Sequence, residues 1–374
     1  MTHLFKNIIF LIVGVLLIFI VYQSMNIEEG ILDENKQKVI KIGAVLPITG
    51  SMAKYGKSSQ QALELALQEI NKDSKKIELI VEDSALEPKK ALFATRKLID
   101  IDKVQGIVGP IASSETLAVV DVVEKNKVLL MSPGSSAPSI SKSGEYIFRT
   151  VPSDTLEGSY IAKYIFNKLN KKTIAIYYIQ NGFGEGIKNV FMKTFKELGG
   201  VISTVENFTL NQSNHRTGLL KINSTKPNGI YIIGYNEMVS IFEQAHQLNI
   251  KTDFFSTTML NDQDIVSKIS KEATEGTVFA SWDFSIKSTD QYTKDFIEKF
   301  SKSYGYEPDV FSANSYDALK ILALALEKKS PINYIYNIKG YNGASGTISF
   351  DNNGDVFKPM VIKMIHDGKI TNVK

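Results

Sequence analysis

Short apolar, β-branched runs alternate with segments of helical period along most of this chain, and this alternation constrains the fold more than any other feature. Val39–Leu46 is typical of a buried strand, and Gly56–Asn71 carries its apolar residues at helical spacing. Strands separated by helix-length segments pair in parallel, because a parallel neighbour needs a long crossover. We therefore predict an α/β fold built on open parallel sheets rather than a β-sandwich.

The alternation restarts once, which indicates two lobes. The chain of 374 residues is too long for one ordinary domain, and a second strand–helix series begins after Arg149–Ser153. Each series predicts a doubly wound, Rossmann-like lobe. Later, Asn352–Asp355 places an Asn-Gly pair between apolar segments, which is typical of a hairpin joining strands Gly346–Phe350 and Val356–Ile365.

We expect the chain to cross between these lobes three times, in a hinge. The crossings are predicted near Arg149–Ser153, Ala280–Phe284 and Gly346–Gly354. Lobe 1 then comprises residues 39–150 and 281–350, and lobe 2 comprises residues 151–280 and 351–374. Ligands of open α/β sheets bind beyond the carboxyl ends of the strands. Two such lobes facing each other therefore predict a ligand cleft between them.

The first residues are predicted to lie outside this fold. Ile8–Tyr22 carries no charge and follows Lys6, which is the pattern of an export signal or an N-terminal membrane anchor. No small-residue cleavage site follows, so we favour an uncleaved anchor over residues 1–22 and a polar tether over residues 23–38. Positive charge before the apolar run and acidic residues after it predict that the body lies outside the cytoplasm, in the periplasm or on the outer face of the cytoplasmic membrane.

Composition and motifs argue against several classes of protein. The net charge is +3, with three arginines and no lysine run, which argues against nucleic acid as a partner. Cysteine is absent, which excludes disulfides, thiolate metal sites and a cysteine nucleophile. The four histidines have no metal-ligand spacing, and neither a Walker P-loop nor a G-x-S-x-G motif occurs. We therefore predict a protein that is not an enzyme and holds no metal or cofactor.

One glycine-rich segment resembles a dinucleotide motif only superficially. Gly182–Gly186 follows a predicted strand and opens a helix, but Ile187 occupies the last position of the G-x-G-x-x-G spacing. We predict a tight turn from strand to helix at this segment, with no phosphate ligand.

Two turns rich in hydrogen-bond donors follow neighbouring predicted strands. Gly109–Ser114 leads into a helix, whose free N–H groups and positive dipole end attract anions. Pro133–Pro138 repeats this chemistry after the next strand. Taken alone, this turn is better explained by Ser113 or Ser114 capping the helix, without a ligand. Together the two turns indicate a site for a small carboxylate.

The chain resembles the leucine/isoleucine/valine-binding family of type I periplasmic solute-binding proteins. The matching segments lie in order across residues 39–374. They are Gly43–Gly50 with Tyr55-Gly56, Asp83–Pro88, Val108–Pro110 with Ser113-Ser114, Ser132–Pro138, Phe148–Thr150, Phe183–Gly186, Gly234-Tyr235, Tyr304–Pro308 and Tyr316–Ala318. The resemblance implies a monomeric, non-catalytic receptor whose two lobes close over a small ligand like a Venus flytrap. Such receptors hand the ligand to an ABC transporter permease.

The resemblance also implies which residues hold the ligand. Its carboxylate is expected to meet two hydroxyls and two backbone groups, those of Ser113, Ser136, Ala112 and Gly134. Aromatic side chains are expected to line the cleft, at Tyr55, Phe183 and Tyr235. Charge-assisted hydrogen bonds and water-excluding aromatic walls suit a small carboxylate with an apolar part.

One position departs from the family pattern. Thr258 stands where the amino-acid binders have an acid that answers the ligand's α-ammonium. An ammonium buried without a partner is costly. Either Asp262 or Asp283 replaces that acid and the ligand is an amino acid, branched-chain-like by default, or the ligand is a carboxylate or amide that lacks the ammonium. The alternative to a transport receptor is a sensory ligand-binding module of the same fold.

Overall fold

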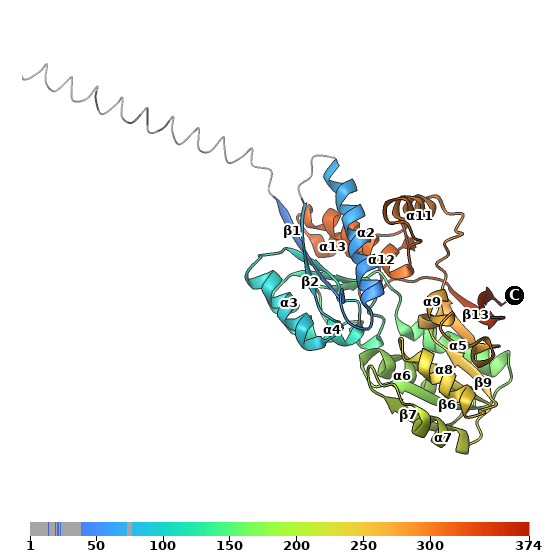
Figure 1. Ribbon diagram of the computed structural model, residues 1–374. Helices are drawn as coiled ribbons and strands as arrows, with labels where there is room; N and C mark the ends of the chain where they lie inside the picture. The colour runs from blue at the N-terminus through green and yellow to red at the C-terminus, as the bar shows by residue number, and fades with distance from the viewer. Residues whose placement is uncertain are drawn as a thin grey trace, which may run out of the picture.

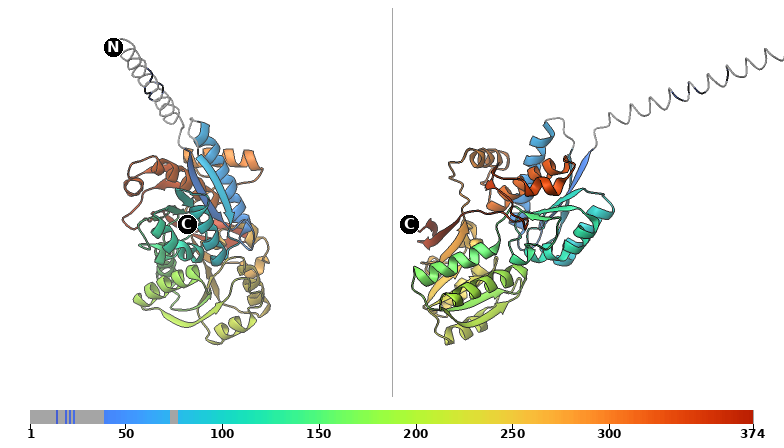
Figure 2. Two further views of the ribbon diagram at one scale, coloured as in Figure 1. Left: turned by 90° about the vertical axis from the view of Figure 1, so that its left-hand side faces the viewer. Right: turned by 180° about the vertical axis from the view of Figure 1, so that it is seen from behind.

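The chain folds into two lobes, each built around its own β-sheet (Figure 1). The computed structural model describes residues 39–72 and 77–373, together with the single residues Gly14, Phe19, Val21 and Gln23. In the views of Figure 2, the green and yellow segments of lobe 2 form a body separate from the blue and orange segments of lobe 1. The predicted α/β class with two doubly wound lobes is confirmed.

The predicted anchor and tether fall on the first 38 residues. Apart from the four single positions, residues 1–22 and 23–38 lie outside the described part of the chain. Within the described part, no helix is both long enough and apolar enough to cross a membrane. The anchor and the tether therefore stay predictions.

Lobe 1 contains a five-stranded, all-parallel sheet in the order β2-β1-β3-β4-β5. Its strands are β1 (Ile40–Leu46), β2 (Ile77–Asp83), β3 (Gly106–Val108), β4 (Leu129–Ser132) and β5 (Ile147–Arg149). Its helices are α2 (Ala53–Lys72), α3 (Pro88–Asp100), α4 (Ser113–Asn126), α11 (Gln291–Tyr304), α12 (Val310–Leu326) and α13 (Pro331–Tyr336). A short antiparallel pair, β11 (Tyr341–Gly343) and β12 (Gly346–Ile348), follows α13.

Helices cover both faces of the lobe 1 sheet, which explains why its strands are almost continuously apolar. Ile42 and Ala44 of β1 belong to the core that includes α2 and α12, whereas Val45 belongs to the core beneath α3 and α4. Helix α12 packs against α2 (Figure 1) and is buried along most of its length. The core of lobe 1 therefore joins residues from both ends of the described chain.

Lobe 2 contains a seven-stranded sheet in the order β14-β13-β10-β9-β8-β6-β7. Its parallel strands are β6 (Thr173–Ile179), β7 (Val201–Phe208), β8 (Gly229–Ile233), β9 (Asp253–Ser256) and β10 (Val278–Trp282). Two antiparallel strands complete the edge, β13 (Met360–His366) and β14 (Lys369–Asn372). Its helices are α5 (Asp154–Asn167), α6 (Gly182–Glu197), α7 (Arg216–Ser224), α8 (Met238–Gln247), α9 (Gln263–Val266) and α10 (Lys271–Thr274).

The chain passes between the two sheets three times. The first passage connects β5 to α5, the second connects β10 to α11, and the third connects β12 to β13. Each lobe is therefore built from segments that are far apart in the sequence. The residue-level lobe bounds that we predict, at 150/151, 280/281 and 350/351, stay predictions.

The predicted hairpin near the end of the chain is wrong. Asn352–Asp355 does form a turn, but only one antiparallel bridge, between Phe350 and Val356, follows from it. Beyond this bridge the two segments diverge, because β12 pairs with β11 while β13 pairs with β10 and β14. The carboxylate of Asp355 is bound by Arg149, so the turn packs on the first crossing and no strand ladder extends from it.

Arg149 joins the first crossing to the third. Its side chain is fully buried, and its Nε donates a hydrogen bond of 2.7 Å to Asp355 Oδ1. Its other two nitrogens donate to the carbonyl oxygens of Ser135 (3.2 Å) and Ala137 (3.0 Å) and to Ser141 Oγ (2.7 Å). A planar guanidinium can satisfy these acceptors at once. Arg149 therefore fixes the backbone on both sides of Ser136.

We expect Arg149→Lys to lower the free energy of unfolding by about 3 kcal/mol, because one ammonium cannot reach all the acceptors that the guanidinium serves. Urea unfolding followed by the fluorescence of Trp282 measures this loss. Arg96, exposed on α3, provides the matched control, and Arg96→Lys should change the free energy by less than about 0.5 kcal/mol. Equal effects in the two variants would contradict the role assigned to Arg149.

Candidate functional site

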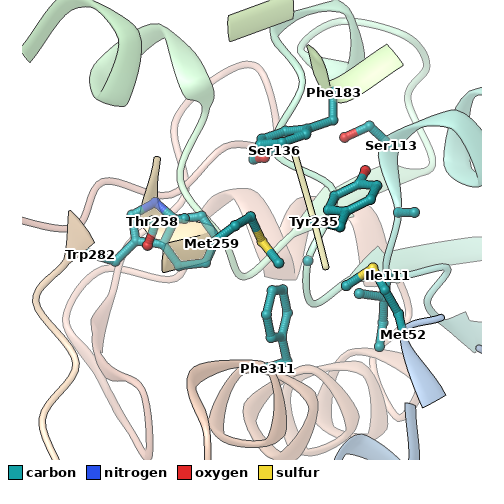
Figure 3. A pocket seen from close by; sticks show the side chains of 12 residues that line it. Met52, Ile111, Ser113, Ser136, Phe183, Tyr235, Thr258, Met259, Trp282 and Phe311 are labelled. Carbon is teal, nitrogen blue, oxygen red and sulfur yellow. The ribbon is translucent and has the colours of Figure 1, made fainter. Parts of the chain in front are cut away.

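A cavity lies between the two lobes, beyond the carboxyl ends of strands from both sheets. Lobe 1 contributes the turns after β3 and β4 and the start of α12, while lobe 2 contributes the start of α6 and the turns after β8 and β9. Twelve residues line the cavity (Figure 3), namely Met52, Ile111, Ala112, Ser113, Gly134, Ser136, Phe183, Tyr235, Thr258, Met259, Trp282 and Phe311. None of these twelve carries a charge.

This cavity brings together seven of the eight residues predicted to bind a ligand. Lobe 1 supplies Ala112, Ser113, Gly134 and Ser136, and lobe 2 supplies Phe183, Tyr235 and Thr258. The eighth, Tyr55, lines a neighbouring cleft of about 500 Å³ instead. The positions are observed, whereas the binding role of these residues stays a prediction.

Sequence reasoning missed much of the apolar part of the cavity. Trp282 carried a usable signal, because it is the only tryptophan and lies in the predicted crossing near Ala280–Phe284. Met259 directly follows Thr258, which was identified. Phe311 carried no such signal, since only the packing of α12 beside α2 brings it to the cavity, whereas Met52 lies in the connection from β1 to α2.

Ser113 presents a hydrogen-bond donor to the cavity. Helix α4 begins at Ser113, and its N-cap residue is Ala112, so the alternative in which a serine caps this helix is wrong. The hydroxyl oxygen of Ser113 accepts a hydrogen bond of 3.1 Å from the backbone N–H of Ala137. Its hydrogen has no acceptor among the described residues. Ser113 can therefore donate to an anion, as can the N–H groups at the start of α4.

Ser136, unlike Ser113, presents a hydrogen-bond acceptor to the cavity. Its hydroxyl donates a hydrogen bond of 3.0 Å to Oδ2 of the buried Asp154. The backbone N–H of Asp154 in turn donates to the carbonyl oxygen of Ser136, at 2.8 Å. With its hydrogen used in this way, the Ser136 oxygen offers only lone pairs to the cavity. The two serines therefore suit different ends of a ligand.

Thr258 connects the cavity to a second buried acid. Its backbone N–H donates a hydrogen bond of 2.7 Å to Oε1 of Glu157, which is fully buried on α5. Its hydroxyl lies 3.2 Å from Ser281 Oγ. Both polar groups of Thr258 are thus engaged by residues outside the cavity.

Phe183 and Tyr235 form an aromatic wall on the lobe 2 side. Their rings stack at a centroid distance of 5.4 Å and an interplanar angle of 16°. Phe183 lies in the first turn of α6, and Tyr235 follows β8. Such a pair can exclude water from an apolar ligand group.

The Gly182–Gly186 segment forms the predicted strand-to-helix turn and also lets the lobes touch. The side chain of Asn181 caps α6 by accepting the N–H of Gly184 at 3.0 Å. A Cβ on Gly182 would lie 3.1 Å from Leu117 Cδ1, and a Cβ on Gly186 would lie 2.7 Å from Pro138 Cδ. Both neighbours belong to lobe 1, so a larger residue would push α6 away from it.

The cavity is small, with a volume of about 20 Å³. That is room for about one water molecule. The thioether of Met259 reaches across the middle of the cavity toward Phe311 (Figure 3). Methionine side chains repack easily, so a larger ligand can enter if Met259 moves or if the lobes separate.

Lys54 connects the lobes beside the cavity. Its ammonium lies 2.7 Å from Asp262 Oδ2 and 2.6 Å from Asp264 Oδ2, across from α2 to the start of α9. The hydroxyl of Tyr55 donates to Asp262 as well, at 2.5 Å. Although burial acts to raise the pKa of Asp262, the hydrogen bonds from Lys54 and Tyr55 hold it below its ordinary value.

The two predicted ammonium partners lie outside the cavity lining, although the cleft beside Asp262 adjoins the cavity and shares Thr258, Met259 and Phe311 with it. Asp262 is paired with Lys54 and lines the neighbouring cleft. Asp283 follows β10 and donates its backbone N–H to the carbonyl oxygen of Pro359, at 3.1 Å. Neither lines the cavity that holds Ser113 and Ser136.

The sequence of this chain matches known proteins over most of its length. The sequence model of a family described as "Periplasmic binding protein" matches residues 39–369. The "Leucine-, isoleucine-, valine-, threonine-, and alanine-binding protein" of Pseudomonas aeruginosa is 27% identical over 348 residues, which cover 90% of this chain and 92% of that protein.

Two solved structures cover nearly the whole described chain. The leucine-binding protein LivK of Thermotoga maritima has a TM-score of 0.82 and 27% identity, covering 90% of this chain and 98% of that one. The branched-chain amino acid transporter substrate-binding protein LivJ of Streptococcus pneumoniae, solved with isoleucine, has a TM-score of 0.79 and 28% identity, covering 89% and 98%.

We expect Lys54→Ala to shift the lobes apart, because the Lys54 ion pairs join them. Lys54 is about half exposed, so the effect should be at most about 1 kcal/mol, or roughly a fivefold change in the ratio of closed to open molecules. The chain has no cysteine, so spin labels can be attached through Lys90→Cys in lobe 1 and Lys221→Cys in lobe 2. The distance distribution between the labels reports the separation.

Lys97→Ala is the matched control for the Lys54 variant. Lys97 also forms two carboxylate ion pairs, with Glu82 and Asp102, but both lie within lobe 1. Its loss should leave the distance between the labels unchanged. A distribution that shifts equally in both variants, or in neither, contradicts the role of Lys54.

Proposed function

The chain belongs to the periplasmic binding protein family, as its resemblance predicts, and we propose that it is the extracytoplasmic solute-binding component of an ABC transporter. The observation that carries this proposal is the cavity between the lobes, where Ser113 and the start of α4 offer donors and the remaining lining is largely apolar. Hydroxyl and N–H donors bind a carboxylate, and apolar walls hold the rest of a small ligand. We assign the protein no catalytic role.

We further propose an amino acid with an apolar, branched side chain as the ligand. The names of the relatives support this choice, since one is called a leucine-, isoleucine-, valine-, threonine- and alanine-binding protein and another was solved with isoleucine. In this arrangement the Ser113 hydroxyl and the free N–H groups at the start of α4 donate to the carboxylate, and Ser136 accepts from the amine; the N–H of Ala112 is already bound to Glu115, at 3.4 Å. The apolar side chain then lies among Met52, Ile111, Met259, Trp282 and Phe311.

The proposal also gives a role to the first 38 residues, as anchor and tether, and to a permease, as the receiver of the ligand. We propose that residues 1–22 hold the protein at the outer face of the cytoplasmic membrane and that residues 23–38 serve as the tether. The body then captures the ligand outside the cytoplasm and delivers it to the permease. The extracytoplasmic location follows from the family, whereas the anchor rests on the charge-free run Ile8–Tyr22.

We expect leucine to bind the wild-type chain and to bind Ser113→Ala and Ser136→Ala roughly ten- to a hundredfold more weakly. Each substitution removes a hydrogen bond to a charged ligand group, worth about 1.5–3 kcal/mol. Isothermal titration measures the affinities, with isoleucine as a second ligand. Ser143→Ala is the control, because the Ser143 hydroxyl has no hydrogen-bond partner among the described residues and Ser143 does not line the cavity. Absence of binding by the wild-type chain would refute the proposed function.

We expect the full chain to fractionate with membranes and a shortened chain that begins at Lys38 to stay in the supernatant. The shortened chain should bind leucine as tightly as the full chain, because the ligand cavity lies within residues 39–373. Fractionation with immunodetection measures the distribution. Recovery of mature protein with a new N-terminus between Ser24 and Lys38 would show a cleaved signal instead.

A further inference from the structure

Two fully buried carboxyl groups lie directly behind the lining of the cavity. Asp154 is the first residue of α5, and Glu157 follows one turn later on the same helix. Asp154 accepts the hydroxyl of Ser136 at 3.0 Å, and Glu157 accepts the backbone N–H of Thr258 at 2.7 Å. Each acid is therefore one hydrogen bond away from a residue that lines the cavity.

Each of these carboxyls has one oxygen without a partner among the described residues. The unpartnered atoms are Asp154 Oδ1 and Glu157 Oε2. The hydroxyl of Tyr231 is also buried without a partner, and its pKa is raised by burial and by the nearby Glu157 and Asp154. Buried polar atoms are rarely left unpaired, because each costs free energy. These three groups lie near one another, directly behind the lining of the cavity.

The cluster also lacks a counter-charge. The nearby cation is Arg149, whose guanidinium is already bound to Asp355 and to two carbonyl groups. Burial raises the pKa of Asp154, although Ser136 and Arg149 oppose this shift. Burial and the charge of Asp154 raise the pKa of Glu157 well above its ordinary value. A cation placed in the cavity would stabilise the charged form of both carboxyl groups and so lower their pKa values.

We propose that Asp154 and Glu157 supply the negative charge that selects a ligand with a protonated amine, acting through Ser136 and Thr258 from behind the cavity. This inference rests on the proposed function and narrows it to a zwitterionic amino acid. The Ser136 hydroxyl donates its hydrogen to Asp154, and its oxygen accepts an N–H from the amine, so two successive hydrogen bonds connect the ligand's positive charge to the carboxylate. In a buried site such a charge acts strongly without direct contact.

The pair also explains how the cavity can accept an amino acid although none of its lining residues is charged. Asp262 is a weaker candidate for this role, because Lys54 already neutralises it. Asp154 and Glu157 act here as positioning residues that set ligand specificity, since neither lines the cavity itself.

The test compares leucine with 4-methylpentanoate, the same molecule without its amine, by titration into the full chain. We expect the wild-type chain to bind leucine at least about tenfold more tightly than 4-methylpentanoate. In Glu157→Gln and in Asp154→Asn, leucine should bind about tenfold more weakly or worse, while 4-methylpentanoate binds as before or more tightly. Both substitutions keep an oxygen that can accept the hydrogen bond from Thr258 or Ser136.

Two further variants act as comparisons. Glu298→Gln changes an exposed glutamate on α11 and should bind both ligands like the wild-type chain. Asp262→Asn tests the rival acid, and a loss of leucine preference in this variant alone would overturn the proposal. If Asp154→Asn does not fold, as judged by its unfolding temperature without ligand, Glu157→Gln decides the outcome.

The remaining outcomes separate this proposal from the proposed function. If the wild-type chain binds both ligands equally, the carboxylate-binding function stands and the charge-selection proposal is overturned. If the acid variants weaken both ligands by the same factor, the acids have a structural role only, and the proposal is again overturned. If the wild-type chain binds neither ligand, the proposed function fails and this inference fails with it.

Discussion

The buried guanidinium of Arg149 connects the hinge to the ligand cavity. It binds Asp355 in the third crossing and the carbonyl groups of Ser135 and Ala137 in the turn after β4. Because an arginine stays charged at any pH that a protein tolerates, these acceptors are engaged permanently. Ser136, which lies between the two carbonyl groups, is held where its hydroxyl reaches Asp154. The polarity of the cavity therefore depends on a residue that does not line it.

Charge is kept out of the cavity lining and placed in the layer behind it. The lining residues are hydroxyls, backbone groups, sulfurs and rings, while Asp154 and Glu157 contact Ser136 and Thr258 from the far side. Direct contact with a carboxylate would bind any amine strongly. In the proposed arrangement the charge acts through a serine hydroxyl, whose hydrogen bonds are directional, so it favours an amine at one position. Lobe 2 contributes both these acids, which lie on α5, and the stacked rings of Phe183 and Tyr235.

The sequence predicts the strands well and the site in part. The sequence predicts strand β1 to within one residue, as Val39–Leu46 against the observed Ile40–Leu46, because this parallel strand is mostly buried and apolar. The donor-rich turns are predicted because parallel strands end at one edge of a sheet. Phe311 is not, since only tertiary packing brings it there. Asp154 and Glu157 were missed because acids in a first helical turn are usually explained by the helix dipole.

The three crossings also determine the order in which the chain can complete its cores during synthesis. Helix α2 packs against α12, which ends at Leu326, so the core of lobe 1 stays open until most of the chain has been made. The parallel strands of lobe 2, from Thr173 to Trp282, are contiguous and can assemble earlier. The face of the lobe 1 sheet under α2 and α12 is thus among the last surfaces to be buried. A nascent chain with this connectivity leaves that apolar face partly uncovered while the strands of lobe 2 are being made.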